Sequence, residues 1–574
     1  MARLDEVARS RLFGYGSVLL IQAKVLWGIW QYRDLSAGDT SNYFVGASTW
    51  ADHRLLDPLF SPLYTVFWGS LEWVFTDTYA VTIAHRVVIV FAVTTLVLAV
   101  LRRLLSPAIA WAIAVWWAIL PLNYDTLNEV HLFSLLPILV AALVALRYSG
   151  PRMRAAVFGI LLGALVLQRN EILVAAIAWL AVCNAYEWWA RRHARRQGES
   201  PTPIPRILKP LGVATAAVIL LTALTLSRSR SDLTAGEWVD RAQYKQDLAL
   251  CQHYAVGYQQ RHRADPTLGW LDCGSFMRRD FGSSQPSFFE ALASNPSAMG
   301  GHFRWNATLF PYALELALFD RTSGSEYHNP DYVPATTGSW IALVGFLVVL
   351  GFVAFGLRLL WLRRRWWWKE WVGARSWGWV LLGCSAFLGI WVALATHPRP
   401  AYLFPLDFAL FAVIGMCAMA VAARWPRLRR LRAAIPVAAL LLVLLIPSHY
   451  ERGYANPLSG TGRGAADMVS RLQPYREAIR GEGTILLGPH SFEACNYLVP
   501  EDPCEGAHVG LLDPTGGSTR TWLDRNHVDL IYEDETTLVD PTSRLALGRL
   551  QRDGWRRVAP SDLGSAGWLL LERR

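Results

Sequence analysis

The sequence contains few charged residues for its length. Only 17% of its 574 residues are Asp, Glu, Lys or Arg, whereas 53% are hydrophobic and 12% are aromatic. Soluble globular domains carry roughly a quarter charged residues, so much of this apolar surface must face something other than water. The composition therefore argues against a soluble enzyme.

Short motifs of several enzyme and metal-protein classes are also missing. The sequence has no CxxC or HExxH spacing for zinc, no GxSxG nucleophile elbow and no Walker sequence. It has no short-period internal repeat and no low-complexity tract. His253, His262 and His302 show no regular ligand spacing, and we interpret them as surface or structural residues.

Long hydrophobic runs, in contrast, recur along the chain. A helix of about 20 apolar residues crosses roughly 30 Å of hydrocarbon with its backbone hydrogen bonds satisfied internally. We expect about eleven such helices, near residues 12–30, 80–101, 107–122, 131–147, 155–169, 171–189, 208–227, 339–361, 377–396, 405–423 and 433–447. The expected fold class is an α-helical polytopic membrane protein.

The basic residues lie between these runs. The net charge of +10 would also suit a nucleic-acid-binding protein, but that needs a contiguous basic face on a soluble domain. Arginines instead precede the first span and follow every second span thereafter, which is the positive-inside pattern. This pattern predicts a cytoplasmic N-terminus, an outer C-terminus and no nucleic acid partner.

The first span contains Lys24 and no cleavage site follows it, so we expect an uncleaved anchor.

Three long segments then lie outside the cytoplasm: residues 31–79, 228–338 and 448–574. We divide the chain into a transmembrane domain, 1–447, which includes the first two of these loops, and an outer domain, 448–574. In the outer domain, β-prone runs at 484–487, 528–532 and 567–572 alternate with helical stretches near 465–480 and 543–552. This alternation predicts a small α/β domain.

Four of the seven cysteines lie in the outer segments, and the other three lie within spans. An even number of exported cysteines suits an oxidising compartment. Since each pair lies within one loop or domain, we predict disulfides between Cys251 and Cys273 and between Cys495 and Cys504.

Carboxylates in the outer loops are the first candidates for chemistry. Asp39 follows the first span, where a carboxylate can take a proton from an acceptor hydroxyl or position a divalent cation, Mg²⁺ or Mn²⁺. The Gly-Asp-Thr-Ser sequence around Asp39 also suits a helix start. Asp125 and Glu129 in the loop before the fourth span could assist, although Asp125 could equally cap that helix.

Cations at the outer ends of spans are the second group. Arg169 interrupts apolar sequence, where a charge is costly unless it faces protein or ligand, and either a pairing with Glu171 or a bound phosphate would satisfy it. Arg399 and Tyr402 lie in a short outer turn, and His53 lies in the first outer loop. We name these residues as candidates for binding a donor phosphate. Snorkelling at the interface is the alternative for the cations, and an aromatic-belt position is the alternative for Tyr402.

Several of these features together resemble the GT-C superfamily of membrane glycosyltransferases. The resemblance covers residues 1–450 and rests on the following set: Gly38-Asp39-x-x-x-Tyr43-x-x-x-Ala47, Pro58-Leu59-Phe60-Ser61-Pro62-Leu63-Tyr64, His85-Arg86, Gly159 to Gly163 with Arg169, and Arg399-x-x-Tyr402-Leu403-x-Pro405. Within this superfamily, the sequence is similar to the protein mannosyltransferase and aminoarabinose transferase families, which use polyprenyl-phosphate sugars. Those families often have Asp-Glu where this sequence has Asp39-Thr40.

The resemblance implies an inverting glycosyltransferase of a bacterial inner membrane. It would move a sugar from a polyprenyl-phosphate carrier to a protein, lipid or polysaccharide acceptor on the periplasmic side, with Asp39 as the general base. No DxD spacing occurs in the first loop, so metal dependence stays open. The alternatives are a transporter or flippase for lipid-linked sugars, for which we find no inverted repeats, and a non-enzymatic envelope assembly protein.

Overall fold

The computed structural model describes most of the 574 residues. The described residues are 10–31, 35, 39–56, 61–75, 77–124, 129–197, 208–227, 235–264, 269, 272–330, 337–425, 434–448, 468–481, 483–488, 491–507, 519–534, 538, 541–559 and 568–573.

The chain forms two compact units. Unit 1 consists of Met1–Gly28, Asp57–Leu63 and Arg86–Tyr454, and unit 2 consists of Ile29–Leu56, Tyr64–His85 and Ala455–Arg574. Helix α3 (Asp39–His53) and most of α4 (Pro62–Glu72), both from the first outer loop, thus belong to the same unit as the C-terminal residues. No sequence pattern predicted this grouping.

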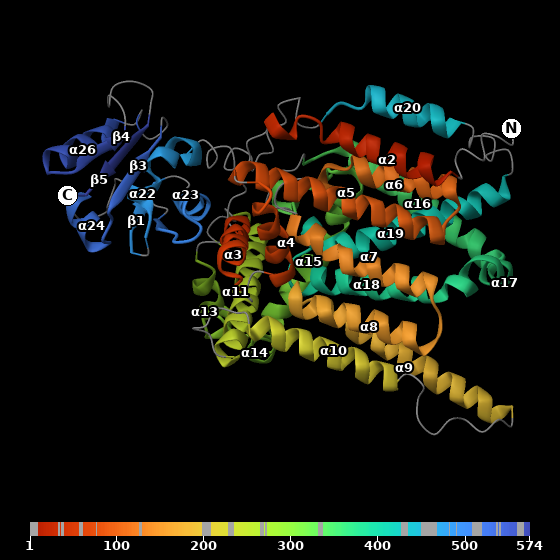
Figure 1. The fold of residues 1–574 in the computed structure, drawn as a ribbon. Coiled ribbons are helices and arrows are strands. Elements are labelled where there is room, and N and C mark those ends of the chain that lie inside the picture. Colours follow the sequence, from red (N-terminus) through yellow and green to blue (C-terminus); the bar gives the residue numbers. More distant parts are fainter. Residues whose placement is uncertain are drawn as a thin grey trace. The chain divides into compact units, whose positions relative to one another are not determined.

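Each of the eleven predicted spans corresponds to a helix (Figure 1). These helices are α2 (Arg11–Val25), α5 (Thr78–Leu104), α6 (Pro107–Ile119), α7 (Glu129–Arg147), α8 (Gly150–Leu167), α9 (Ile172–Arg196), α10 (Leu208–Ser227), α16 (Trp340–Leu362), α18 (Ser376–Ala395), α19 (Phe404–Arg424) and α20 (Ile435–Leu445). The expected polytopic helical fold is confirmed.

Not all eleven helices are long enough to span a bilayer alone. Among the described residues, seven are long and apolar enough to do so: α5, α7, α8, α9, α16, α18 and α19. The described apolar stretches in three other helices are shorter: Pro107–Ile119 (α6), Lys209–Thr225 within α10, and Ile435–Leu445 (α20). Helix α2 has 15 residues, about 22 Å, so it does not cross roughly 30 Å of hydrocarbon alone.

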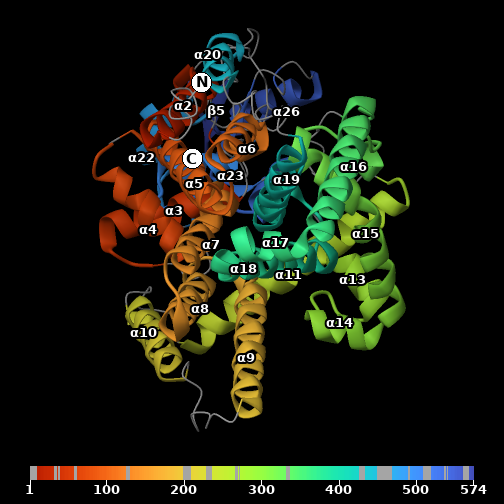
Figure 2. The same ribbon diagram turned by 90° about the vertical axis from the view of Figure 1, so that its right-hand side faces the viewer.

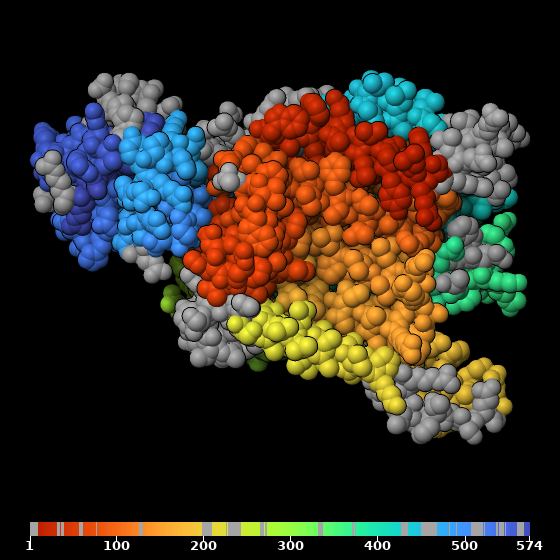
Figure 3. Space-filling model, viewed as in Figure 1, coloured from red at the N-terminus to blue at the C-terminus, as the bar shows by residue number. Residues whose placement is uncertain are grey.

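Helices of unit 1 pack closely where small residues meet. Helices α10, α8 and α9 lie side by side (Figures 1 and 2), and α10 covers part of the α8 surface in the space-filling view (Figure 3). A Cβ atom on Gly356 of α16 would overlap Cys417 of α19, and one on Gly389 of α18 would overlap Leu406. Glycine therefore permits these close approaches, as is common between membrane helices.

The segment between α10 and α16, which the sequence analysis predicts to lie outside the cytoplasm, contains helices α11 (Ala235–Arg261), α13 (Cys273–Phe281), α14 (Phe288–Ser294) and α15 (Pro296–Phe319). A disulfide between Cys251 and Cys273 joins α11 to α13, with Cα atoms 5.4 Å apart. In unit 2 a second disulfide joins Cys495 to Cys504, with Cα atoms 5.0 Å apart. Both predicted pairings are confirmed.

The C-terminal residues form a five-stranded mixed sheet with the strand order β2-β1-β3-β5-β4. The strands are β1 (Ile485–Leu487), β2 (Glu505–Ala507), β3 (Leu530–Glu533), β4 (Arg556–Ala559) and β5 (Leu569–Glu572). Strand β1 is parallel to β2 and β3, whereas β5 is antiparallel to β3 and β4. Helices α23 (Ser491–Leu498), α24 (Thr519–Arg525) and α26 (Pro541–Arg552) connect the strands, which confirms the small α/β domain.

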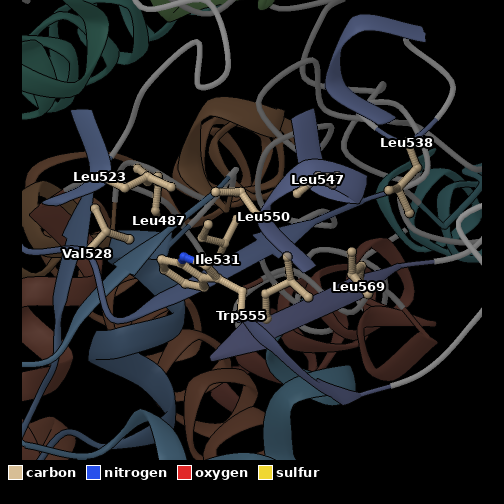
Figure 4. Close-up of a cluster of buried hydrophobic side chains, with 10 residues drawn as sticks. Leu487, Leu523, Val528, Ile531, Leu538, Leu547, Leu550, Trp555 and Leu569 are labelled. Atoms are coloured by element: carbon tan, nitrogen blue, oxygen red, sulfur yellow. The ribbon is translucent and has the colours of Figure 1, made fainter. Parts of the chain in front are cut away.

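One face of this sheet packs against α24 and α26. Leu487, Ile531 and Leu571 from the strands and Leu523 and Leu547 from the helices are all fully buried. Most of these side chains are visible together in Figure 4. This cluster is the hydrophobic core of the C-terminal domain.

We expect Leu571→Ala to destabilise this domain by about 2–5 kcal/mol, because it leaves a cavity in the core. Hydrogen exchange of the full-length protein in nanodiscs measures the effect as faster exchange in β3, β4 and β5. Leu545→Ala on α26 is the matched control, since Leu545 is 64% exposed and its truncation should change stability by less than about 0.5 kcal/mol. Equal exchange in both variants would contradict the assigned core.

Candidate active site

Arg169 lies in the turn between α8 and α9. The Arg169 amide donates to the carbonyl of Ala164, which completes the last turn of α8. Its guanidinium donates to the Glu171 carboxylate, so the ion pair considered in the sequence analysis forms. The side chains are 20% and 29% exposed, respectively, and a ligand can therefore reach the guanidinium.

Tyr402 connects Arg169 to two histidines. It lies in the short helix η7 (Pro400–Leu403) before α19, and the Arg169 guanidinium lies 5.8 Å from the centre of its ring. His131 of α7 packs against the same ring at a centroid distance of 4.7 Å. The Tyr402 hydroxyl lies 3.3 Å from Nε2 of His253 on α11. Tyr402 therefore contacts three polar side chains of unit 1.

His253 is held in one tautomer. Its Nδ1 lies 2.5 Å from the carbonyl of Ala249, so Nδ1–H donates to that carbonyl and Nε2 accepts from the Tyr402 hydroxyl. Burial lowers the pKa of His253 to about 4, and the positive charges of Arg399 and Arg169 act in the same direction. His253 is therefore a neutral acceptor at neutral pH.

Helix α15 positions the turn that carries Arg399. Nδ2 of Asn306 donates to the carbonyls of Leu394 and Thr396, at 2.9 Å each, and Nε2 of His302 lies 3.3 Å from the Ala395 carbonyl. These carbonyls belong to the end of α18. Asn306 and His302 are both fully buried, so the second outer loop is part of the support for Arg399.

His397 completes the cluster. It is fully buried, and its ring centroid lies 6.0 Å from that of His253. Burial lowers its pKa well below the ordinary range, and the neighbouring His253, His302 and Arg399 lower it further. Arg399, two residues after His397, is half-buried.

Together these side chains form a polar cluster in unit 1 that contains two arginines. Among the described residues, Arg169 and Arg399, with Lys245 of α11 within electrostatic range of His131, provide the positive charge of this cluster, and Glu171 pairs with Arg169. Neutral imidazoles and a phenol add hydrogen-bonding groups without negative charge. A phosphate bound here would have charge-assisted hydrogen bonds in a partly desolvated setting.

The sequence analysis missed part of this cluster. His253 and His302 are buried and structural rather than surface residues, whereas His262 is exposed. Their spacing contains no signal, because their partners Tyr402 and Ala395 lie 149 and 93 residues away in the chain.

The first-loop motifs of the GT-C resemblance pack together within unit 2. The Tyr64 hydroxyl donates to Nε2 of His85 at 2.9 Å, and the His85 ring stacks on Trp68 at 3.9 Å. Tyr43 of α3 packs edge-on against Tyr64 at 5.3 Å. This buried cluster supports α3 from its own unit.

Other candidates are only partly covered by the structure. Asp39 is the first residue of α3 and Glu129 is the first residue of α7, but the side chains of both lie outside the described part. Asp125 also lies outside the described residues. His53, the last residue of α3, is exposed in unit 2, whereas Arg169 and Arg399 belong to unit 1. Within the described residues, no group of three or more His, Cys, Asp or Glu could hold a metal ion.

Fold and composition define the class: this chain is a multi-pass helical membrane protein with a C-terminal α/β domain. No family model matches it, and no curated protein matches it. Among solved structures, apo ArnT from Cupriavidus metallidurans is similar over 98% of this chain and 98% of that chain, at 13% sequence identity and a TM-score of 0.34. A similarity of this extent assigns no role to any residue.

The buried histidines predict a pH dependence of stability. Burial lowers the pKa of His302 to about 4, against about 6.5 in the unfolded chain. Between these two pKa values the unfolded state binds more protons than the folded state. The contribution of His302 to the free energy of unfolding is therefore fully present above about pH 6.5 and decreases by up to about 3 kcal/mol as the pH falls towards 4. Thermal unfolding in detergent between pH 7 and pH 4 measures this slope.

His302→Gln should reduce that slope, because glutamine can keep the bond to the Ala395 carbonyl but does not titrate. His262→Gln should leave it unchanged, since His262 is exposed. An identical slope in the His302→Gln variant would show that another group causes the acid sensitivity.

Proposed function

We propose that this chain is an inverting membrane glycosyltransferase that moves a sugar from a polyprenyl-phosphate-linked donor to an acceptor on the extracytoplasmic side. The observation that carries the proposal is the cationic cluster of Arg169, Arg399 and Tyr402 at the ends of apolar helices, with uncharged histidines around it. In this proposal the donor phosphate binds at the cluster and its lipid tail lies between the helices. The sequence resemblance to GT-C enzymes agrees with this chemistry.

In the proposed reaction the acceptor hydroxyl attacks the anomeric carbon. Asp39 takes the hydroxyl proton as the new carbon–oxygen bond forms, and the bond between the anomeric carbon and the phosphate oxygen breaks on the opposite face. The polyprenyl phosphate leaves with the electron pair, and Arg169 and Arg399 stabilise its growing negative charge. Because the lipid phosphate is already a leaving group, no nucleotide hydrolysis is needed.

The remaining candidates have supporting roles in this proposal. Glu129 or Asp125 would orient the acceptor, and His53 would add a hydrogen bond to the phosphate. Dependence on Mg²⁺ or Mn²⁺ is tested by transfer assays with and without EDTA. The expected location is a bacterial inner membrane, with basic loops in the cytoplasm and both disulfides in the periplasm.

A transfer assay tests the proposal directly. The protein in nanodiscs is supplied with polyprenyl-phosphate sugars and candidate acceptors, and products are followed by mass spectrometry. The same preparation is examined for co-purified polyprenyl phosphate and for cross-linking of a photoreactive polyprenyl phosphate to α8, η7 and α11. A flippase would move the lipid-linked sugar across the bilayer without a new glycosidic bond, and an assembly protein would do neither.

A further inference from the structure

Unit 2 contains a cavity of about 560 Å³. It is lined by α3, the end of α4, the start of α5 and, from the C-terminal residues, the segment around Gln473 and the end of α23. This volume is within the range of roughly 300–1,000 Å³ that is typical of small-molecule sites. Among the described residues, none of those proposed above for the transfer reaction lines it.

One side of the cavity carries negative charge. Among the described residues, four carboxyl groups line it, from Asp52, Glu72, Asp77 and Glu501, together with one guanidinium, that of Arg476. Arg476 pairs with Glu501, so the other three acids have no cation beside them among the lining residues that the structure describes. The Ser48 hydroxyl lies 3.0 and 3.1 Å from the two carboxylate oxygens of Glu72, to which it donates.

The other side is aromatic. Phe44 and Tyr497 pack against each other with ring centres 5.1 Å apart, and Trp73, Phe75 and Tyr79 extend the wall. Trp73 is 56% exposed, with the Arg54 guanidinium over its ring at 4.2 Å, and Phe75 is 38% exposed, so apolar ring surface is accessible beside the carboxylates. An apolar wall beside several hydrogen-bonding groups is the usual composition of a specific small-molecule site.

The charge and the side-chain types exclude several ligand classes. Negative charge repels phosphate, nucleic acid and anionic lipid headgroups. A metal ion held only by these acids is also disfavoured, since no cluster of described residues has the arrangement for a metal ion. A sugar ring fits both walls, because its C–H faces pack on aromatic rings and its hydroxyls donate to carboxylates and accept from Arg476, Gln473 or Ser470.

We infer that this cavity binds a saccharide without phosphate or carboxylate substituents. As part of the acceptor glycan of the proposed transfer, a role that rests on the proposed function, this saccharide would be held in the cavity while a different sugar residue of the same glycan carries the hydroxyl that is glycosylated. Burial raises the pKa of Glu72 to about 7, so at neutral pH this carboxyl is protonated in about half of the molecules and can donate to a sugar hydroxyl as well as accept from one.

The cavity is separate from the position of Asp39. Ser48 follows Asp39 on helix α3 by nine residues, which corresponds to about 14 Å along the axis and about half a turn around it. Asp52 lies one turn further on. Saccharide binding in the cavity should therefore not require the Asp39 carboxylate.

Saturation-transfer NMR with the full-length protein in nanodiscs tests this inference. The probes are soluble neutral oligosaccharides of arabinose, mannose and glucose, with oligogalacturonate and a phosphorylated mannose oligosaccharide as anionic counterparts. At least one neutral probe is expected to bind through its ring C–H protons with a millimolar dissociation constant, whereas the anionic probes bind at least tenfold more weakly. The double variant Asp52→Asn, Glu72→Gln should weaken neutral binding at least tenfold.

Two controls separate this inference from the proposed function. Glu477→Gln alters an acid whose side chain is 83% exposed and does not line the cavity, so binding should be unchanged. Asp39→Asn should also keep neutral binding, even though the proposed transfer is lost. Absence of binding by every neutral probe, equal binding of anionic probes, or binding unaffected by the double variant would overturn the inference, whatever the transfer assay shows.

Discussion

Asp39→Asn is expected to lower the rate of sugar transfer by roughly 10³-fold, within the 10²–10⁴ range that a general base contributes. Asparagine keeps the size of the side chain but cannot take the proton of the acceptor hydroxyl. Because the substitution leaves the proposed phosphate site intact, binding of the polyprenyl-phosphate donor should change little. The loss should therefore appear in kcat rather than in the dissociation constant of the donor.

Asp272→Asn is the matched control for this prediction. Asp272 is an exposed acid of the second outer loop, and its side chain does not cap α13, so this variant should retain full activity. Both variants are compared by product formation under single-turnover conditions and by donor binding. Unchanged transfer in Asp39→Asn would refute the assignment of the base, and weaker donor binding alone would place Asp39 in donor recognition.

The architecture was largely predictable because it rests on local patterns. Hydrophobic run length determined the positions of all eleven helices, and the C-terminal runs around Leu487, Ile531 and Leu571 became strands β1, β3 and β5. Strands β2 and β4 were missed because Glu505–Ala507 and Arg556–Ala559 lack a β-branched apolar run. Their strand conformation depends on pairing with β1 and β5.

The residues of the candidate site were predictable only where a charged residue lies within apolar sequence. Arg169 and Arg399 were recognisable because an arginine among apolar residues needs a partner or a ligand. The contacts that position them come from Tyr402, His253 and Asn306, which are brought together by tertiary packing from segments far apart in the chain. No spacing rule contains such information.

The division into compact units was not predictable for the same reason. Asn496 on α23 donates to the Ser41 hydroxyl at 2.8 Å, and Phe44 packs on Tyr497, so helix α3 joins the C-terminal residues across more than 450 positions of sequence. The sequence suggested a linear division at residue 447, because hydrophobicity ends there. Contacts between single side chains that are far apart in the chain do not change the hydrophobicity along the sequence, so they could not be predicted from it.

Arg169→Gln is expected to lower kcat/KM for the polyprenyl-phosphate sugar by roughly 10²–10³-fold. The substitution removes the cation over Tyr402 and leaves the Glu171 carboxylate without its partner, where it would repel the donor phosphate. Both effects weaken donor binding and raise the energy of the transition state, in which phosphate charge increases.

Three variants separate these contributions. The double variant Arg169→Gln, Glu171→Gln removes the repulsion and should recover donor binding by about tenfold, whereas kcat stays low because the stabilising cation is still missing. Arg169→Lys keeps the charge but not the planar fork, so it should retain an intermediate rate. Arg304→Gln, an exposed arginine on α15, should behave like the unmodified protein. If Arg169→Gln changed neither donor binding nor kcat while Arg304→Gln also had no effect, the Arg169–Glu171 pair would be a structural ion pair, and the donor phosphate would have to bind elsewhere.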